Sequence, residues 1–194
     1  MYVVHTIDTA PEPSRSALEA ANSSYGFIPN LYAVLAESPA ALNAYAGINE
    51  ALSKSRFSAA ETQLVAIATS VENDCSYCVA AHSTVAAMHN MHRTVIDDLR
   101  SESPLPDPKL EALRNLTVAV VRKRGWLDAS DLDAFFSFGY DKGHVLDVLA
   151  IVALKTLSNY TNHLAETPLD GVFAPQRWEK QPQGHGPRVQ KGAA

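Results

Sequence analysis

Two cysteines and a histidine near the middle of the chain have the types and spacing of a redox site. Cys75 and Cys78 are the only cysteines in the protein, and His82 follows four residues after the second. On an α-helix, residues three, four and seven apart lie on one face, so these side chains are expected to form a single stripe. A dithiol beside a basic nitrogen is typical of thiol chemistry or of part of a metal site.

The order of events at such a dithiol depends on which sulfur ionises. The thiolate is the nucleophile, and a helix N-terminus or a neighbouring base favours it. His82 is the expected base, directly or through a water, which favours Cys78 as the attacking sulfur and Cys75 as the resolving one. The opposite assignment stays open, because the first cysteine of such a motif is usually the more exposed. Glu72 could hold the imidazole, or its own charge could oppose thiolate formation.

Two alternative roles for the cysteines involve no catalysis. A structural zinc ion usually needs four protein ligands. Only Cys75, Cys78 and His82 are close in sequence, and His89 and His92 are the candidates for a fourth ligand. The other alternative is a pair of buried, inert cysteines beside a satisfied core histidine. Redox chemistry is favoured over both, so we predict neither a metal nor another cofactor.

The composition limits the class of protein. The 194 residues are 46% hydrophobic and 19% charged, which is typical of one globular domain with a substantial core. The formal net charge of -5 argues against a nucleic-acid partner. No apolar run reaches the roughly 18 residues of a membrane span, and the N-terminal residues do not resemble a secretory signal. We therefore expect a cytoplasmic protein whose two cysteines do not form a structural disulfide.

Start and stop signals divide the chain into helices without a sustained strand pattern, so the predicted fold class is all-α. Ser58 and Glu61 form a capping-box pattern ahead of an apolar helix that residues 72–74 end. Asn73 or Asp74 is then expected to cap the next helix, with Cys75 in its first turn. Further helices are expected over residues 14–22, from 29, over 38–52, 92–99 and 108–124, from 130, and over 142–165.

One helical domain is expected to span residues 1–180. Residues 181–194 hold almost no large apolar side chain, and we expect them to form a polar tail that is mobile or packed on a neighbouring subunit. Trp126 and Trp178 are expected to be packing residues.

The residues around the dithiol resemble a known family. The pattern S-x-E-N-x-C-x-Y-C-x-A-A-H-S over residues 70–83 is similar to the alkylhydroperoxidase AhpD-like family of the carboxymuconolactone decarboxylase superfamily. A C-x-x-C-x-x-x-H motif after a capped apolar helix and a short acidic turn is the hallmark of that family. The likeness extends more weakly to residues 26–31 and 159–163.

The resemblance implies a fold, an activity and partners. The fold would be an AhpD-like helical bundle that forms homo-oligomers, often dimers, trimers or hexamers. The activity would be that of a thiol-dependent (alkyl hydro)peroxidase or disulfide reductase without metal or haem, acting on a small hydroperoxide or disulfide. A dithiol or lipoylated protein would be the electron donor. The alternatives are a non-catalytic redox-sensing or metal-binding oligomer, and a decarboxylase-like enzyme with His82 as the base.

Two positions depart from the family pattern, although both cysteines and the histidine match it. The relay glutamate of the family, twelve residues before the first cysteine, is Gln63 here. Glutamine can form a hydrogen bond but cannot take a proton. Glu61 already has a role in the capping box, so Glu72 is the expected substitute. The histidine that some members carry between the cysteines is Tyr77 here.

Overall fold

The computed structural model describes residues 2–180, and this part of the chain contains helices and no strand. The predicted all-α class is therefore confirmed. The expected tail over residues 181–194 lies outside the described residues. The described part of the chain forms nine α-helices and two 3-10 helices: α1 (Glu12–Tyr25), α2 (Asn30–Leu35), α3 (Pro39–Ala51), η1 (Leu52–Lys54), α4 (Ala59–Glu72), α5 (Ser76–Met88), α6 (Arg93–Arg100), α7 (Pro108–Lys123), α8 (Ala129–Phe136), α9 (Lys142–Ala165) and η2 (Gly171–Gln176).

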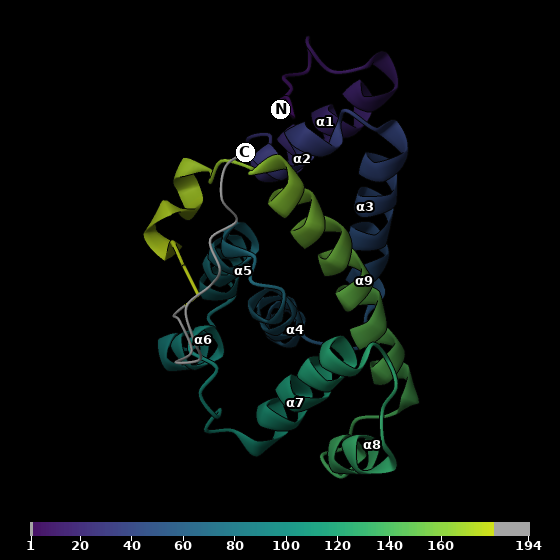
Figure 1. The fold of residues 1–194 in the computed structure, drawn as a ribbon, viewed down its shortest axis with the longest axis vertical. Coiled ribbons are helices and arrows are strands. Elements are labelled where there is room, and N and C mark those ends of the chain that lie inside the picture. Colours follow the sequence, from purple (N-terminus) through teal and green to yellow (C-terminus); the bar gives the residue numbers. More distant parts are fainter. Residues whose placement is uncertain (1, 181–194) are drawn as a thin grey trace, which may run out of the picture.

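Helix α4 is the centre of the fold. Residues 64–71 of this helix are all buried, and α5, α6, α7 and α9 pack around it. Figure 1 shows α4 between α5, α7 and α9. A helix that is buried on all sides depends on its neighbours for stability. It begins at the predicted capping box, in which Ser58 Oγ accepts a hydrogen bond from the Glu61 N–H at 3.2 Å and Glu61 Oε2 accepts one from the Ser58 N–H at 2.9 Å.

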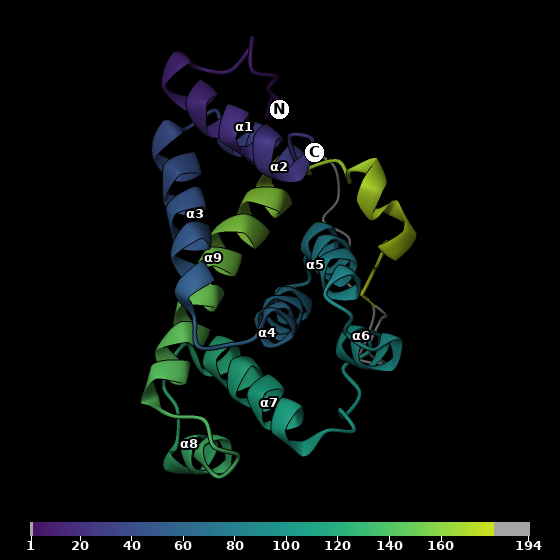
Figure 2. The ribbon, with the colours of Figure 1, turned by 180° about the vertical axis from the view of Figure 1, so that it is seen from behind.

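The N-terminal helices form a second core with the dithiol. Helices α1, α2 and α3 pack on one another, and α2 and α3 also contact α9. Figure 2 shows this group at one end of the molecule, with α9 running from it towards α8 at the other end. The buried side chains of this core include Leu18, Leu42 and Leu154 together with Cys75 and Cys78. The two sulfurs therefore lie where α5, α9 and the N-terminal helices meet.

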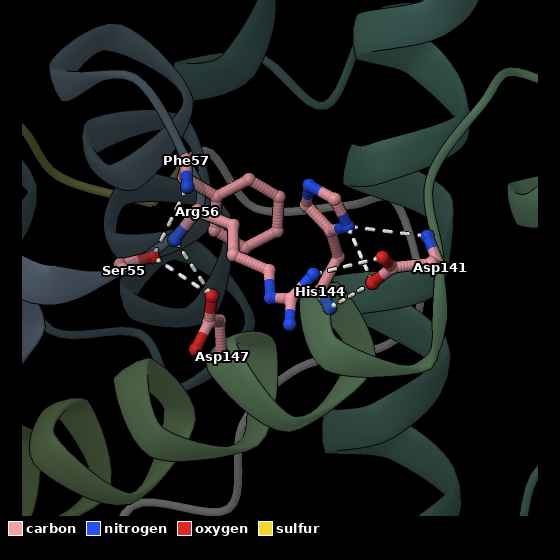
Figure 3. A network of polar contacts seen from close by, with 6 residues as sticks. All are labelled: Ser55, Arg56, Phe57, Asp141, His144 and Asp147. Carbon is pink, nitrogen blue, oxygen red and sulfur yellow. Dashed lines mark hydrogen bonds and ion pairs between the residues drawn. The ribbon is translucent and has the colours of Figure 1, made fainter.

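The connection between α3 and α4 is held against the first turns of α9 (Figure 3). Asp147 Oδ2 accepts hydrogen bonds from Ser55 Oγ at 3.1 Å and from the backbone N–H of Arg56 at 2.9 Å. The Phe57 ring packs on the His144 imidazole, with ring centroids 5.2 Å apart. These contacts fix the position of Phe57, which lines the cavity described below.

After α9 the chain turns back across α5 and α6. Trp178 Nε1 donates to the carbonyl of Arg100 at 3.0 Å, and Arg100 Nη2 donates to the carbonyl of Arg177 at 2.9 Å. Trp178 is buried, as predicted. The same prediction for Trp126 is wrong, since this side chain is 86% exposed. Trp126 follows two residues with positive φ, Arg124 and Gly125, at the end of α7.

The predicted helices differ from the observed ones mainly at their ends. The last helix has the predicted bounds, Lys142–Ala165. The first is longer than expected at both ends, and Pro29 is the N-cap of α2 rather than its first residue. Helix α8 begins at Ala129, after a capping box at Asp128. Within residues 2–180, no helix combines the length and apolar character needed to cross a membrane.

Candidate active site

The dithiol lies at the N-terminus of α5, and Cys75 itself is the N-cap. The prediction that Asn73 or Asp74 caps this helix is wrong, because Asn73 still closes α4 and Asp74 turns the chain with a φ of 57°. The Cys75 N–H then donates to the carbonyl of Ser70 at 2.9 Å. Cys78 is consequently the third residue of the helix. Backbone N–H groups in this first turn lack helical partners, so they favour an anion there.

Polar groups of α9 surround the two sulfurs. Both cysteines are free thiols, and each is 1% exposed. Asn162 Nδ2 donates to Cys78 Sγ at 3.3 Å and more weakly to Cys75 Sγ at 3.8 Å. Cys78 Sγ also forms a hydrogen bond with Ser158 Oγ at 3.7 Å. The buried dithiol thus has hydrogen-bond partners from a helix about eighty residues further along the chain.

The two sulfurs differ in how easily they ionise. Burial opposes a thiolate at Cys78. The hydrogen bond with Cys75, the charge of Lys155 and the hydrogen bonds with Ser158 and Asn159 outweigh it and lower the pKa of Cys78 to about 5. The hydrogen bond to Cys78, together with burial, raises the pKa of Cys75. The pair therefore carries one thiolate near neutral pH, centred on Cys78, and Cys75 keeps its proton.

His82 connects a glutamine to a lysine. Its Nδ1 forms a hydrogen bond with Gln63 Oε1 at 2.7 Å, and its Nε2 forms one with Lys155 Nζ at 2.5 Å. Because the glutamine oxygen only accepts, Nδ1 carries the proton and Nε2 accepts from the lysine. Burial, and then the charge of Lys155, hold the pKa of His82 well below its usual range. The imidazole is therefore neutral at physiological pH.

In place of the predicted contact with Cys78, the His82 imidazole is hydrogen-bonded to Lys155. Within residues 2–180, the hydrogen bonds to the sulfurs come from α9 and from the cysteines themselves, and none comes from His82. Lys155 is hydrogen-bonded to the imidazole, and its charge acts on Cys78. The structure thus brings Cys75, Cys78 and His82 into one region and adds Lys155, which contacts the imidazole and whose charge lowers the pKa of Cys78.

Glu72 lies outside this cluster. Its carboxylate accepts hydrogen bonds from Arg122 of α7, at 2.7 Å from Nε and 2.8 Å from Nη2. Gln63 and Glu72 are nine residues apart, about two and a half turns, and so they face opposite sides of α4. The expected substitution by Glu72 is therefore not what the structure contains, and Gln63 itself contacts the imidazole.

Tyr77 anchors the C-terminal segment to the dithiol helix. Its hydroxyl donates to Asp170 Oδ2 at 2.5 Å and accepts from the Leu31 N–H at 3.3 Å. Asp170 also accepts from the Asn30 N–H at 3.1 Å. One side chain between the two cysteines thus joins α2, α5 and the segment after α9.

Replacing Tyr77 with phenylalanine would remove the hydroxyl that serves the buried Asp170 carboxylate. We expect the free energy of unfolding to fall by about 1–3 kcal/mol, since a buried acceptor loses a partner. Urea unfolding of the reduced protein measures this. Tyr160→Phe is the matched control, because Tyr160 is 55% exposed, and it should leave stability unchanged. Equal unfolding midpoints for both variants would contradict the anchoring role.

A cavity of about 300 Å³ borders His82 and the two side chains hydrogen-bonded to it. Gln63, His82 and Lys155 are part of its lining, and the sulfurs are not. Within residues 2–180, no group of three or more His, Cys, Asp or Glu side chains is arranged to hold a metal ion. The rest of the lining is mostly apolar and consists of Asn49, Leu52, Ser53, Phe57, Ala59, Thr62, Ala66, Ile151 and Leu154.

Lys155 and Asn162 were missed by sequence reasoning, although the sequence holds a signal for the lysine. Lys155 is the only Asp, Glu, Lys or Arg between Asp147 and Glu166, inside the apolar run of the last helix. A single charge in such a run is buried only when it has a partner or a function. Asn162 lies in residues 159–163, for which the sequence carried only the weaker family likeness.

Fold and site define an all-helical protein with a buried, asymmetric dithiol. The model of the carboxymuconolactone decarboxylase family matches residues 39–103, which include α3 to α6. No curated protein matches the sequence. The matched segment is thus similar to this family, and the whole fold is similar to that of solved structures.

Solved structures with the same fold include two peroxidase-related proteins. One, from Ralstonia eutropha, has an alkylhydroperoxidase AhpD core and is 24% identical, with a TM-score of 0.79 over 92% of this chain and 97% of its own. The other, from Silicibacter, is 18% identical, with a TM-score of 0.75 over 89% and 93%. The debrominase Bmp8 is 16% identical, with a TM-score of 0.71 over 85% and 90%. The fold therefore occurs with more than one named function.

Proposed function

We propose that the protein is a thiol-dependent hydroperoxide reductase, with Cys78 as the attacking sulfur and Cys75 as the resolving one. The observation that carries this proposal is the asymmetry of the pair. A lowered pKa makes Cys78 a thiolate at neutral pH, and the raised pKa of Cys75 keeps a protonated thiol within hydrogen-bond distance of it. A nucleophile and its resolving partner are thus both present before substrate arrives.

The reaction is balanced with a hydroperoxide and an external dithiol. The Cys78 thiolate attacks the terminal oxygen of RO–OH, an S–O bond forms, and the electron pair of the O–O bond leaves on RO⁻, which becomes ROH. The sulfenic acid at Cys78 then condenses with the Cys75 thiol to give a disulfide and water. A dithiol donor reduces this disulfide with two electrons and two protons, and so restores the starting state.

The burial of the sulfurs favours a hydroperoxide over a disulfide as the oxidant. Each cysteine is 1% exposed, and a disulfide substrate must present one of its sulfurs to the thiolate in line. A hydroperoxide needs to bring only two oxygen atoms to the same place. The names of the peroxidase-related neighbours agree with this choice of substrate.

A second candidate function is acid–base chemistry of the decarboxylase type. The observation that favours it is the cavity of about 300 Å³, which touches His82 and Lys155 but not the sulfurs. A substrate held there could react without the dithiol. Activity that survives loss of both cysteines would select this candidate over hydroperoxide reduction.

Oxidation of the reduced protein by one equivalent of an organic hydroperoxide tests the first proposal. We expect both thiols to be lost and an intramolecular disulfide to appear. The lowered pKa of Cys78, about 5, means that the thiolate is present above that pH and is protonated below it. The oxidation rate should therefore be nearly constant from about pH 7 to 9 and fall as the pH drops through about 5.

A free monothiol is the control for this pH profile. Its pKa of about 8.5 makes its own oxidation rate rise through the same range. Stopped-flow mixing across the pH series measures both rates. A protein rate that rises like that of the free thiol would contradict a preformed thiolate, and the absence of any disulfide would contradict the function.

A further inference from the structure

The buried lysine on α9 has no carboxylate partner among residues 2–180. Lys155 is fully buried, with 0% exposure, in the middle of the longest helix. Among residues 2–180, none of the recorded ion pairs with an Asp or Glu includes it. Removing an ammonium group from water without an anion nearby is very costly, so a buried lysine requires a counter-charge.

The groups that face Lys155 leave one candidate for that counter-charge. From α5, His82 Nε2 is hydrogen-bonded to it at 2.5 Å, and the imidazole is neutral. From α3, the Tyr45 ring lies 5.9 Å from Nζ, and burial raises the pKa of this phenol, which stays protonated. Cys75 also keeps its proton. The remaining ionisable neighbour is Cys78, whose sulfur is hydrogen-bonded to Ser158, one turn further along α9, and whose pKa is lowered by the lysine charge.

Tyr77, the other titratable residue beside the sulfurs, is excluded by the same reasoning. Burial and its hydrogen bond to Asp170 raise the pKa of the Tyr77 phenol. The Asp170 carboxylate is hydrogen-bonded to that phenol and to the Asn30 N–H. The Asp170 carboxylate is thus already engaged in holding the C-terminal segment. The Cys78 thiolate therefore remains as the anion for Lys155.

Building on the proposed function, we infer that Lys155 is a catalytic residue with two roles. Its ammonium group is the counter-ion of the Cys78 thiolate, and it donates the proton that the leaving oxygen of the hydroperoxide takes up. Lys155 can do both because it acts on the sulfur and also lines the cavity of about 300 Å³. The inference places the RO group of the attacked hydroperoxide in this cavity, which Lys155 lines and the sulfurs do not.

Charge and protons balance through the cycle. The resting site holds Cys78–S⁻ and Lys155–NH₃⁺. Breaking the O–O bond gives Cys78–SOH and RO⁻, and transfer of one proton gives ROH and neutral Lys155–NH₂. Condensation with Cys75 then releases water and leaves a neutral disulfide beside a neutral amine. The dithiol donor returns two electrons and two protons, of which one restores the Cys75 thiol and the other restores the ammonium.

Lys155 is better placed than His82 to act as the proton donor. The imidazole donates its Nδ1 proton to Gln63, which cannot exchange one, and its Nε2 is occupied by the lysine. His82 therefore holds the ammonium in place by accepting from it. Once the lysine is neutral, the same nitrogen can still accept an N–H, so the position of Lys155 is kept through the cycle.

Titration of the thiolate in lysine variants tests the counter-ion role without any substrate. Lys155→Met and Lys155→Gln remove the charge at similar length, and Lys155→Arg keeps it. Lys142→Met, at the exposed start of α9, is the matched control. We expect the first thiolate midpoint, read from ultraviolet absorbance against pH, to rise by about one to three units in both neutral variants. It should stay near that of the unmodified protein in Lys155→Arg and Lys142→Met.

The proton-donor role is tested by the oxidation rate at high pH. At neutral pH we expect Lys155→Met to be oxidised about 10²–10⁴-fold more slowly. Above its new midpoint the thiolate is fully formed, yet part of the deficit should persist because the proton donor is missing. Complete recovery there would overturn the donor role, and unchanged midpoints in both neutral variants would overturn the counter-ion role. If hydroperoxide fails to oxidise even the unmodified protein, the proposed function fails, while the midpoints still decide the counter-ion role.

Discussion

Cys78→Ser is expected to abolish hydroperoxide-dependent oxidation of a dithiol donor. A serine hydroxyl at this position has the same hydrogen-bond partners, Asn162 and Ser158, but it does not ionise near neutral pH. The variant should also lose the low-pH thiolate signal of Cys78, and burial still opposes ionisation of the remaining Cys75. A coupled assay of donor oxidation, run with saturating hydroperoxide, measures the loss.

Ser76→Ala is a suitable control for Cys78→Ser. Ser76 is an exposed residue of the same helical turn, so its substitution tests whether any change there disturbs the reaction. We expect it to retain the activity of the unmodified protein. Turnover by Cys78→Ser at the unmodified rate would contradict the assignment of the nucleophile. If the variant with both cysteines replaced still acted on a small acid, the cavity beside His82 would be the reactive site.

Several features around the dithiol could be predicted from short stretches of the sequence. The capping box at Ser58 and the bounds of the last helix follow from patterns within a few turns of helix. The hydrogen bond between Gln63 and His82 joins two helices and was not predicted. Opposite faces for Gln63 and Glu72 also follow from helical periodicity, which excludes Glu72 as a partner of the imidazole once the helix is accepted. That step needs only the sequence.

The contribution of α9 to the site depends on contacts between distant residues. Lys155, Ser158, Asn159 and Asn162 follow at spacings of three, one and three, so that one face of the helix carries all four polar groups. The sequence shows that they share a face, but the packing of α9 on α5 decides that this face meets the sulfurs. His82 and Lys155 are separated by 73 positions, and no local pattern predicts their hydrogen bond.

The N-cap position of Cys75 was missed for a different reason. Asn and Asp are stronger caps than Cys, so the residues before it were expected to begin the helix. The turn from α4 to α5 is too short for that, because Asn73 completes one helix and Asp74 reverses the chain. A cap side chain acts as a hydrogen-bond acceptor, so the S–H of Cys75 is available to Cys78 whether or not its sulfur caps the helix.

Cys75→Ser is expected to stop the reaction after a single oxidation. Without a resolving thiol, the sulfenic acid at Cys78 cannot form the disulfide, so turnover with a dithiol donor should be lost while one equivalent of hydroperoxide is still consumed. A serine hydroxyl can donate to the thiolate as the thiol did, so the first step should remain fast. Trapping of the sulfenic acid with a carbon nucleophile, followed by mass spectrometry, measures this state.

Comparison of Cys75→Ser with Cys75→Ala separates the two roles of this residue. Alanine removes both the resolving sulfur and the hydrogen bond that lowers the pKa of Cys78. We therefore expect the thiolate midpoint to rise in Cys75→Ala and to change little in Cys75→Ser, with turnover lost in both. A sulfenic acid that forms on Cys75 in the Cys78→Ser variant, but not on Cys78 in Cys75→Ser, would reverse the assignment of the two sulfurs.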